Sequence, residues 1–472
     1  MPHLTGARRP AFRWIATSTA VLFSIAAATA CSSSSAADDA AKPTSTVSVV
    51  AADTTTVAPD DAGNATTATT VVPGTTTSTS TTSTTSPTFE ASATSITAPV
   101  NSAPERFTGT EDEFYAPPDP FPAGEPGDLI RVMDVGVADG SVTVKVMYHS
   151  RDAQDRDRPV TGVITYPIGE APIGGWPVVA TAPGTTGIAP QCALSRILDG
   201  QPAPAWGVDG VRVITDYIGL GPTGGPLHPY LSKPSEGHSV IDGVRAAHNL
   251  AETHAGTTWL SVGHSQGGHG ALSASELAAD YAPELDLVGT LALAPAALLD
   301  RLYGGIDPIV TGILTTMSLY GGAGEHPEII LDDYVTPELA AVAGVMETGC
   351  LDEISTALAG LAAGNQLFTN DPRTTDPAKS VLLANDVGNV AVDAPLFLVS
   401  GTADDRVVID RFRDTYARFC AAGQVTELLI VDGATHGSII GDTAVQTAAW
   451  LTARLAGDEP TNTCDTSPTA TG

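Results

Sequence analysis

Two early runs in which hydrophobic and polar residues alternate, 142–148 and 160–166, flank a charged segment, 151–158. Alternation with a period of two turns one face of a strand towards the core, so these runs predict an antiparallel hairpin. Later runs are largely apolar and are separated by helical or loop segments, which is typical of a buried parallel sheet. These later runs are residues 178–182, 211–214, 259–262, 287–293, 396–399 and 428–431. We therefore expect an α/β protein with a mostly parallel central sheet.

The first hundred residues lack this periodicity. Residues 1–30 carry three arginines before an apolar stretch that is too short for a transmembrane helix, and they predict a secretory signal peptide. The segment that ends at Cys31 resembles a bacterial lipobox, which implies lipidation of Cys31 and a membrane anchor; cleavage and release is the alternative. Residues 31–105 are rich in Ser, Thr, Ala and Pro and predict a disordered linker. The protein is thus expected to be exported, as a cell-envelope lipoprotein or a secreted protein.

Charge excludes one class of partner. The net charge is −31 and becomes −34 without the signal peptide, because that segment has three arginines and no acidic residue. Such a surface repels nucleic acid and favours solubility, and it says little about the reaction. The sequence contains no CxxC or HExxH motif, so no metal site is expected.

Cysteine usage agrees with export. Setting Cys31 aside leaves four cysteines, Cys192, Cys350, Cys420 and Cys464. In an exported protein four cysteines can form two disulfides, with three possible pairings. Free buried thiols are the alternative.

One serine stands where a buried strand is expected to turn sharply into a helix. The apolar run 259–262 leads into the motif Gly-His-Ser-Gln-Gly centred on Ser265, and an Ala- and Leu-rich segment with helical spacing follows. The two glycines let strand and helix pass closely, and the start of the helix directs N–H groups towards a developing oxyanion. Ser265 is therefore the expected nucleophile of an acyl transfer.

A nucleophilic serine needs a histidine as its base and a carboxylate that orients this base. When the serine lies on such a turn, the order along the chain is nucleophile, acid, histidine. Of the ten histidines only His326 and His436 lie well beyond Ser265. Only His436 follows an expected strand, whereas His326 lies in a glycine-rich loop and is expected to face solvent. His436 is therefore the expected base.

Two aspartates, Asp404 and Asp405, follow the expected strand 396–399. The spacing from Gly401 favours Asp404 as the acid, with Asp405 as the alternative. Both could instead cap the following helix.

The oxyanion requires two N–H donors. The first is expected to be the backbone N–H of Gln266, and the second an N–H of the loop 183–187 after the strand that ends at residue 182. Proline has no N–H, so Thr185 or Thr186 is the candidate there, and Thr186 is preferred.

A further glycine-rich motif follows the expected strand 211–214. Residues 219–224 match the glycine pattern of dinucleotide-binding loops, but a helix should begin at the end of that pattern and none is expected here. We interpret the segment as an ordinary loop at the carboxyl edge of the sheet, and no cofactor is expected. Asp242 and Arg245, three positions apart in a predicted helix, are interpreted as a structural pair.

Several segments together resemble the secretory triacylglycerol lipase family of α/β-hydrolases. They are FYAPPDPFPAGEPGDLIR, APGTTG followed by Cys192, DYIGLG with HPYL, and GHSQGG. The resemblance implies an α/β-hydrolase fold and an ester or lipid substrate, and it implies disulfides pairing Cys192 with Cys350 and Cys420 with Cys464. Pro183 departs from related bacterial sequences, which often carry histidine there.

The folded domain is expected over residues 106–460, with a helical cap at about 296–393 and a flexible tail at 461–472. An ordinary crossover with extra helices is the alternative to a cap. Helix-like stretches in the cap carry apolar side chains that could line an acyl-chain pocket, or could pack on one another and leave a shallow one. The sequence therefore predicts a monomeric, exported lipase or esterase with the triad Ser265, Asp404 and His436. A peptidase or acyltransferase of the same fold and a noncatalytic envelope lipoprotein are the alternatives.

Overall fold

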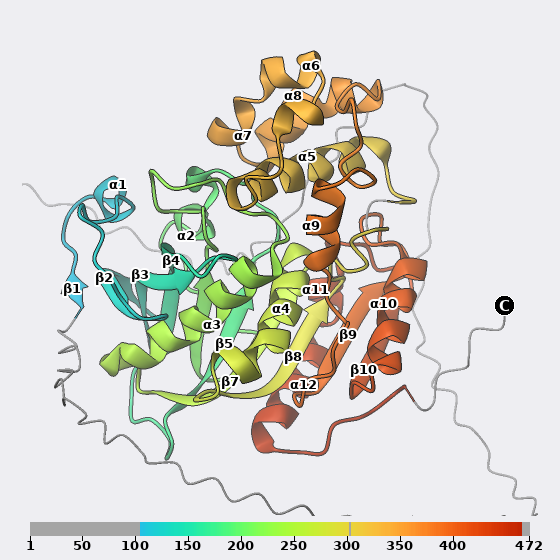
Figure 1. The fold of residues 1–472 in the computed structure, drawn as a ribbon. Helices are drawn as coiled ribbons and strands as arrows, with labels where there is room; N and C mark the ends of the chain where they lie inside the picture. Colours follow the sequence, from blue (N-terminus) through green and yellow to red (C-terminus); the bar gives the residue numbers. More distant parts are fainter. Residues whose placement is uncertain (1–103, 302–303, 465–472) are drawn as a thin grey trace, which may run out of the picture. The chain divides into compact units, whose positions relative to one another are not determined.

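The computed structural model describes residues 104–301 and 304–464 (Figure 1). The expected signal peptide, Cys31 and all but the end of the expected linker lie outside these residues. Among the described helices, none combines the length and the apolar character needed to cross a membrane.

The described strands form one ten-stranded sheet in the order β1-β2-β3-β4-β6-β5-β7-β8-β9-β10. All the strands expected from the sequence are present. Their bounds are β1 (Glu105–Arg106), β2 (Leu129–Ala138), β3 (Ser141–Arg151), β4 (Asp157–Pro167), β5 (Trp176–Ala182), β6 (Val211–Thr215), β7 (Ala255–His264), β8 (Asp286–Leu293), β9 (Leu396–Gly401) and β10 (Thr426–Val431).

The sheet changes character along its width. From β6 to β10 along the sheet, each strand pairs in parallel with the next, and β8 and β9 are adjacent. Pairs between β2, β3, β4 and β6 are antiparallel, and β3 with β4 is the expected hairpin. The sequence did not predict β2, because half of this strand is exposed and a register shift between Asp134 and Gly136 interrupts it.

Helices cover both faces of the parallel strands, which explains why those strands are apolar throughout. Val178 packs in one apolar cluster with Val240 of α3 (Lys233–Asn249) and Ala271 of α4 (Gln266–Tyr281), whereas its neighbour Val179 packs in another with Trp450 of α12 (Ala444–Ala456). The helices are α1 (Glu111–Phe114), α2 (Leu194–Ile197), α3 (Lys233–Asn249), α4 (Gln266–Tyr281), α5 (Pro308–Glu325), α6 (Pro337–Val342), α7 (Val345–Thr348), α8 (Leu351–Ala363), α9 (Ala378–Ala384), α10 (Ile409–Ala421), α11 (Ile439–Asp442) and α12 (Ala444–Ala456).

Helices α5 to α9 lie between β8 and β9 in the sequence, inside the segment 296–393. In Figure 1, α5 to α8 form a group beyond the end of the sheet, and α9 lies between this group and the rest of the domain. Apolar side chains of the group are largely used to pack its helices together. Five that the sequence offered for a pocket wall share one core cluster and are at most 5% exposed: Ile313, Met317, Leu319, Met346 and Leu358.

Both disulfides implied by the family resemblance are present. Cys192 is bonded to Cys350 and Cys420 to Cys464, and the Cα atoms are 5.4 Å apart in each pair. The first disulfide links the segment after β5 to the start of α8. It therefore joins the cap helices to the central domain covalently.

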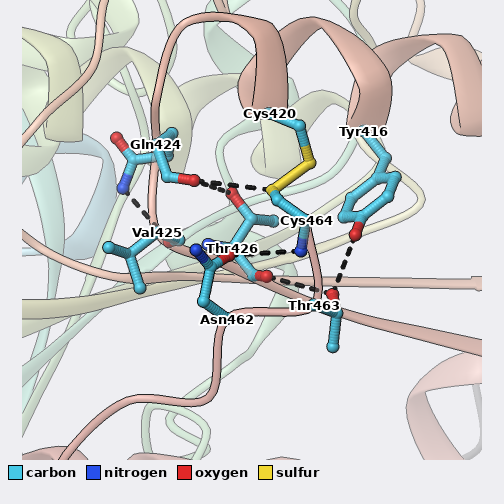
Figure 2. Close-up of a disulfide and its surroundings, with 8 residues drawn as sticks. All are labelled: Tyr416, Cys420, Gln424, Val425, Thr426, Asn462, Thr463 and Cys464. Carbon is cyan, nitrogen blue, oxygen red and sulfur yellow. Dashed lines mark hydrogen bonds between the residues drawn. A yellow bond between two sulfur atoms is a disulfide. The ribbon is translucent and has the colours of Figure 1, made fainter. Parts of the chain in front are cut away.

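The second disulfide corrects one expected boundary (Figure 2). It ties Cys464 to α10, and the Thr463 N–H donates to the Thr426 carbonyl of β10 at 2.9 Å. Residues 461–464 are thus attached to the domain, so a free tail cannot begin at residue 461. Residues 465–472 lie outside the described part.

The glycine-rich segment 219–224 is a loop after β6, and the next helix, α3, begins only at Lys233. No helix begins at the end of the glycine pattern, as expected. Asp242 and Arg245 form the expected pair on α3, with 2.9 Å between Oδ1 and Nη1.

Candidate active site

Ser265 occupies the sharp turn between β7 and α4. Its backbone angles are φ 60° and ψ −121°, a conformation that favours glycine and costs other residues on the order of 1–3 kcal/mol. Backbone hydrogen bonds hold it there, because its N–H donates to the Leu293 carbonyl at 2.9 Å and its carbonyl accepts from the Ala296 N–H at 3.1 Å. The serine expected as nucleophile is therefore fixed in a strained and half-buried position at the carboxyl edge of the sheet.

The glycines on either side of this turn have no room for a side chain. A Cβ atom on Gly263 would lie 1.9 Å from the Gly267 carbonyl oxygen, and one on Gly267 would lie 2.0 Å from the Ala182 carbonyl oxygen. The end of β5 therefore lies directly against the first turn of α4. This contact places the loop 183–187 next to the start of that helix.

The structure brings His436 and Asp404 together. The His436 Nδ1 lies 3.0 and 2.9 Å from the two carboxylate oxygens of Asp404, and Oδ1 also accepts the backbone N–H groups of Arg406 and Val407 at 2.8 Å. The Asp404 side chain is 0% exposed, whereas that of Asp405 is 70% exposed. Asp404, and not Asp405, is therefore placed to orient His436.

His264 connects this pair to the turn. Its Nε2–H donates to the His436 carbonyl at 2.8 Å, and the two ring centroids are 4.5 Å apart. Among the described residues, the Ser265 hydroxyl makes no hydrogen bond to the His436 ring; bonds of this type tighten when substrate binds. No role was expected for His264 from the sequence, although it lies in the motif around Ser265.

Burial, and then the neighbouring His436, lowers the pKa of His264 to about 3. Its ordinary pKa is 6.5, so between these values the unfolded chain binds a proton that the folded protein does not. The stabilising contribution is complete above about pH 6.5 and is lost as the pH falls towards 3.

A His264→Gln variant keeps an N–H donor and removes the titrating ring. We expect its free energy of unfolding to fall less steeply with decreasing pH than that of the parent, by about 1.4 kcal/mol per pH unit in this window. Urea unfolding curves recorded across the window measure both slopes. Equal slopes in the two proteins would show that His264 titrates as it does in the unfolded chain.

The residues expected to bind the oxyanion lie at the same end of the sheet. Gln266 is the first residue of α4, where backbone N–H groups lack intrahelical partners. In the loop 183–187, the Thr186 carbonyl accepts the Leu351 N–H at 2.9 Å, and the Thr185 hydroxyl is 2.9 Å from the Tyr230 hydroxyl. Neither contact uses a threonine N–H, so both threonines stay candidates for the second donor.

Three buried polar residues near Gln266 were not predicted. Glu236, His228 and His269 are each 0% exposed and are hydrogen-bonded to one another or to Gln266. His228 lies in the HPYL segment that carries the family resemblance, whereas Glu236 lies in none of the named segments; the sequence pattern assigned no chemical role to any of the three. Within residues 104–301 and 304–464, no three or more His, Cys, Asp or Glu side chains are grouped so as to hold a metal ion.

Comparison with known proteins gives the family. A family model described as secretory lipase matches residues 207–463, more than half of the chain. The trichothecene C-3 esterase of Fusarium sporotrichioides is 22% identical over 355 residues, which cover 68% of this chain and 77% of that protein. A probable inactive lipase of Mycobacterium tuberculosis is 24% identical over 387 residues, or 74% of this chain and 82% of that one.

The fold has a known counterpart as well. The crystal structure of Candida antarctica lipase A matches with a TM-score of 0.63 at 18% identity, covering 75% of this chain and 88% of that one. Identity this low supports the fold alone, which is the α/β-hydrolase fold, while the family model and the relatives supply the class of reaction. The chain belongs to the secretory lipase family, and it is a carboxylic-ester hydrolase.

Proposed function

We propose that the protein is an exported esterase that cleaves its substrate through an acyl-enzyme formed on Ser265. The observation that carries this proposal is the hydrogen bond between His436 and the buried carboxylate of Asp404, beside the strained turn that presents the serine. Membership of a secretory family supports export. The expected signal peptide would direct export, and lipidation of Cys31 would anchor the protein to a membrane.

In the first step, the Ser265 hydroxyl oxygen attacks the ester carbonyl carbon. Its proton moves to Nε2 of His436, because Nδ1 is held by Asp404. The carbonyl oxygen becomes negative and accepts the Gln266 N–H and an N–H of Thr186 or Thr185. Collapse of this intermediate breaks the bond to the alcohol, which leaves with the proton from His436.

In the second step, water attacks the carbonyl carbon of the acyl-enzyme. His436 accepts a proton from this water, the same donors bind the oxyanion, and the bond to Ser265 breaks. The acid is released, and the proton returns from His436 to the serine. The chemistry requires no cofactor.

The packing of the cap favours short acyl chains. The cavity lined by α5, α9 and residues 229–232 has a volume of about 40 Å³, which is enough for only a few water molecules. Ser265, Asp404 and His436 do not line it. Since Met317, Leu358 and other apolar side chains of the cap are buried in a shared core, we expect them not to form the wall of a long acyl tunnel.

Substrate preference tests this proposal. A tunnel would raise kcat/KM about fourfold for each methylene that it buries. We expect no such gain beyond butyrate when p-nitrophenyl acetate, butyrate, octanoate and palmitate are compared at constant detergent concentration. A continuous rise to palmitate would contradict the expectation and identify a lipase whose cap opens to admit long chains.

A peptide anilide assayed in parallel addresses the nearest alternative. Faster cleavage of the anilide than of every ester would support a peptidase of the same fold. If correctly folded protein turns over none of these substrates, the result would support the noncatalytic alternative. This outcome has to be tested because one relative is named as a probable inactive lipase.

A further inference from the structure

A buried carboxylate binds the first turn of α4 at two points. Glu236, on the first turn of α3, is 0% exposed. Its Oε1 accepts a hydrogen bond from the side-chain amide of Gln266 at 2.7 Å, and its Oε2 accepts one from Nδ1 of His269 at 2.7 Å. One carboxylate therefore holds the residue next to Ser265 and the residue one turn further along the helix.

The hydrogen bonds define how the Gln266 amide is held. Nδ1 of His228 lies 2.9 Å from the Ile218 carbonyl, which can only accept, so Nδ1 carries the proton. Nε2 of His228 is then an acceptor for the Gln266 amide at 2.8 Å. Both hydrogens of this amide are used, one on Glu236 and one on His228, and the side chain cannot rotate without losing a bond.

The partners of His269 also define its charge. Nδ1 faces the Glu236 carboxylate, and Nε2 lies 2.9 Å from the carbonyl of Asn385. Both partners are acceptors, so both ring nitrogens donate and the ring is an imidazolium. Glu236 and His269 form a buried ion pair.

Electrostatics agree with this geometry. Burial would raise the pKa of Glu236, but the charge on His269 and the hydrogen bond from its ring outweigh burial and lower that pKa. Burial would lower the pKa of His269, but the Glu236 charge and its hydrogen bond raise it above the usual value.

The same network reaches the cap. Asn385 ends α9, its carbonyl accepts from His269, and its side-chain oxygen accepts the Lys233 N–H at the start of α3 at 2.8 Å. The backbone N–H of His269 donates to the Ser265 carbonyl at 3.2 Å, which is an ordinary helical bond of α4. The side chains of the ion pair are thus bonded to Gln266, the residue after Ser265, and to Asn385 at the end of the last cap helix.

We propose that Glu236 is a positioning residue for ester hydrolysis, which holds Gln266 and His269 so that the Gln266 N–H stays directed at the oxyanion. The inference rests on the assignment of Ser265 and Gln266 under the proposed function. An ion pair that only stabilises the fold would also be buried. Kinetic measurements separate this structural role from a positioning role.

Glu236→Gln is the first test, because it is close in shape but puts an N–H₂ group where an acceptor is needed. We expect kcat on p-nitrophenyl butyrate to fall about ten- to hundredfold, since a displaced donor weakens only the transition state. KM should stay within about threefold of the parent value for the same reason.

Asp242→Asn is the matched control. Asp242 lies on the same helix and is also 0% exposed, but its partners are Arg245 and Tyr281, away from the first turn of α4. We expect it to change kcat by less than about twofold, even if it lowers the melting temperature as much as Glu236→Gln does.

Gln266→Ala keeps the backbone N–H and removes the anchored amide, so it should lower kcat in the same way. Because both changes break one network, the double variant Glu236→Gln/Gln266→Ala should lose no more activity than the worse single variant. Nitrogen-15 NMR of the parent should show both ring nitrogens of His269 protonated at neutral pH.

Three results would overturn the inference. They are parental kcat in folded Glu236→Gln, equal losses in Glu236→Gln and Asp242→Asn, and a neutral His269 ring. If Glu236→Gln does not fold, Gln266→Ala becomes the deciding variant. Full activity of Gln266→Ala would overturn the inference, and a reduced kcat would support it. A fully active Glu236→Gln protein beside an inactive Ser265→Ala protein rejects this inference alone, whereas an active Ser265→Ala protein rejects the proposed function.

Discussion

The Ser265→Ala protein is expected to hydrolyse p-nitrophenyl butyrate about a millionfold more slowly than the parent, because it lacks the oxygen that forms the acyl-enzyme. Alanine has a Cβ atom like serine, so the strained backbone at residue 265 and the fold should be retained. Steady-state rates at equal protein concentration, together with the melting temperature, measure both effects. An organophosphonate should label the parent at Ser265 and leave the variant unlabelled.

Ser273 supplies the matched control for this experiment. It lies on α4 as well, and its buried hydroxyl has no hydrogen-bond partner among the described residues. Ser273→Ala should therefore keep parental activity. If folded Ser265→Ala protein retains more than about a hundredth of the parental rate, Ser265 is not the nucleophile.

Asp404→Asn is expected to lower kcat by about ten-thousandfold. The carboxylate holds Nδ1–H of His436 and so keeps Nε2 free to accept the serine proton, whereas an amide can stabilise the opposite tautomer. The measurement is kcat on the same ester.

The adjacent Asp405→Asn variant makes this test specific. Asp405 is 70% exposed and lies near Arg406, with 3.9 Å between their charged atoms. Its replacement should leave kcat within about twofold of the parent, as expected for a surface change away from the reacting groups. The reverse result, with Asp405→Asn inactive and Asp404→Asn active, would exchange the roles of the two aspartates.

The parallel half of the sheet could be predicted because helices cover both of its faces. Strands β5 to β10 have to be apolar along most of their length, and continuous apolar runs are visible in a sequence. β2 could not be found in this way, since its outer half is exposed and its pairing with β3 is irregular around Asp134. The position of β2 depends on its pairing with β3 and not on its own pattern of hydrophobic residues.

The catalytic candidates were visible for a different reason. Ser265 lies in a local motif, and the order along the chain then selects one histidine and one pair of aspartates. The structure distinguishes Asp404 from Asp405 by burial, which a sequence does not report. Glu236 was invisible because its partners become its neighbours only when α3 packs on α4.

The apolar pattern of the cap helices is compatible with two different structures. A helix with one apolar face has the same pattern of hydrophobic residues in its sequence whether this face lines a pocket or packs on another helix. For Met317 and Leu358 the structure selects packing, since both are 0% exposed in a shared core. The end of the domain was misplaced for a similar reason, because Thr463 and Cys464 lie in a polar segment that only its disulfide and hydrogen bonds attach to β10 and α10.

The adjacency of β8 and β9 has an evolutionary consequence. The cap leaves the sheet after β8 and returns to it at β9, and these two strands pair directly, with Thr290 opposite Leu396. An insertion between neighbouring strands can grow, shrink or be replaced while the register of the sheet is retained, so selection can change the substrate without redesigning the candidate active site. The bond between Cys192 and Cys350 sets one condition on such exchanges: an incoming cap keeps this link to the sheet domain only if it supplies a cysteine at the position of Cys350.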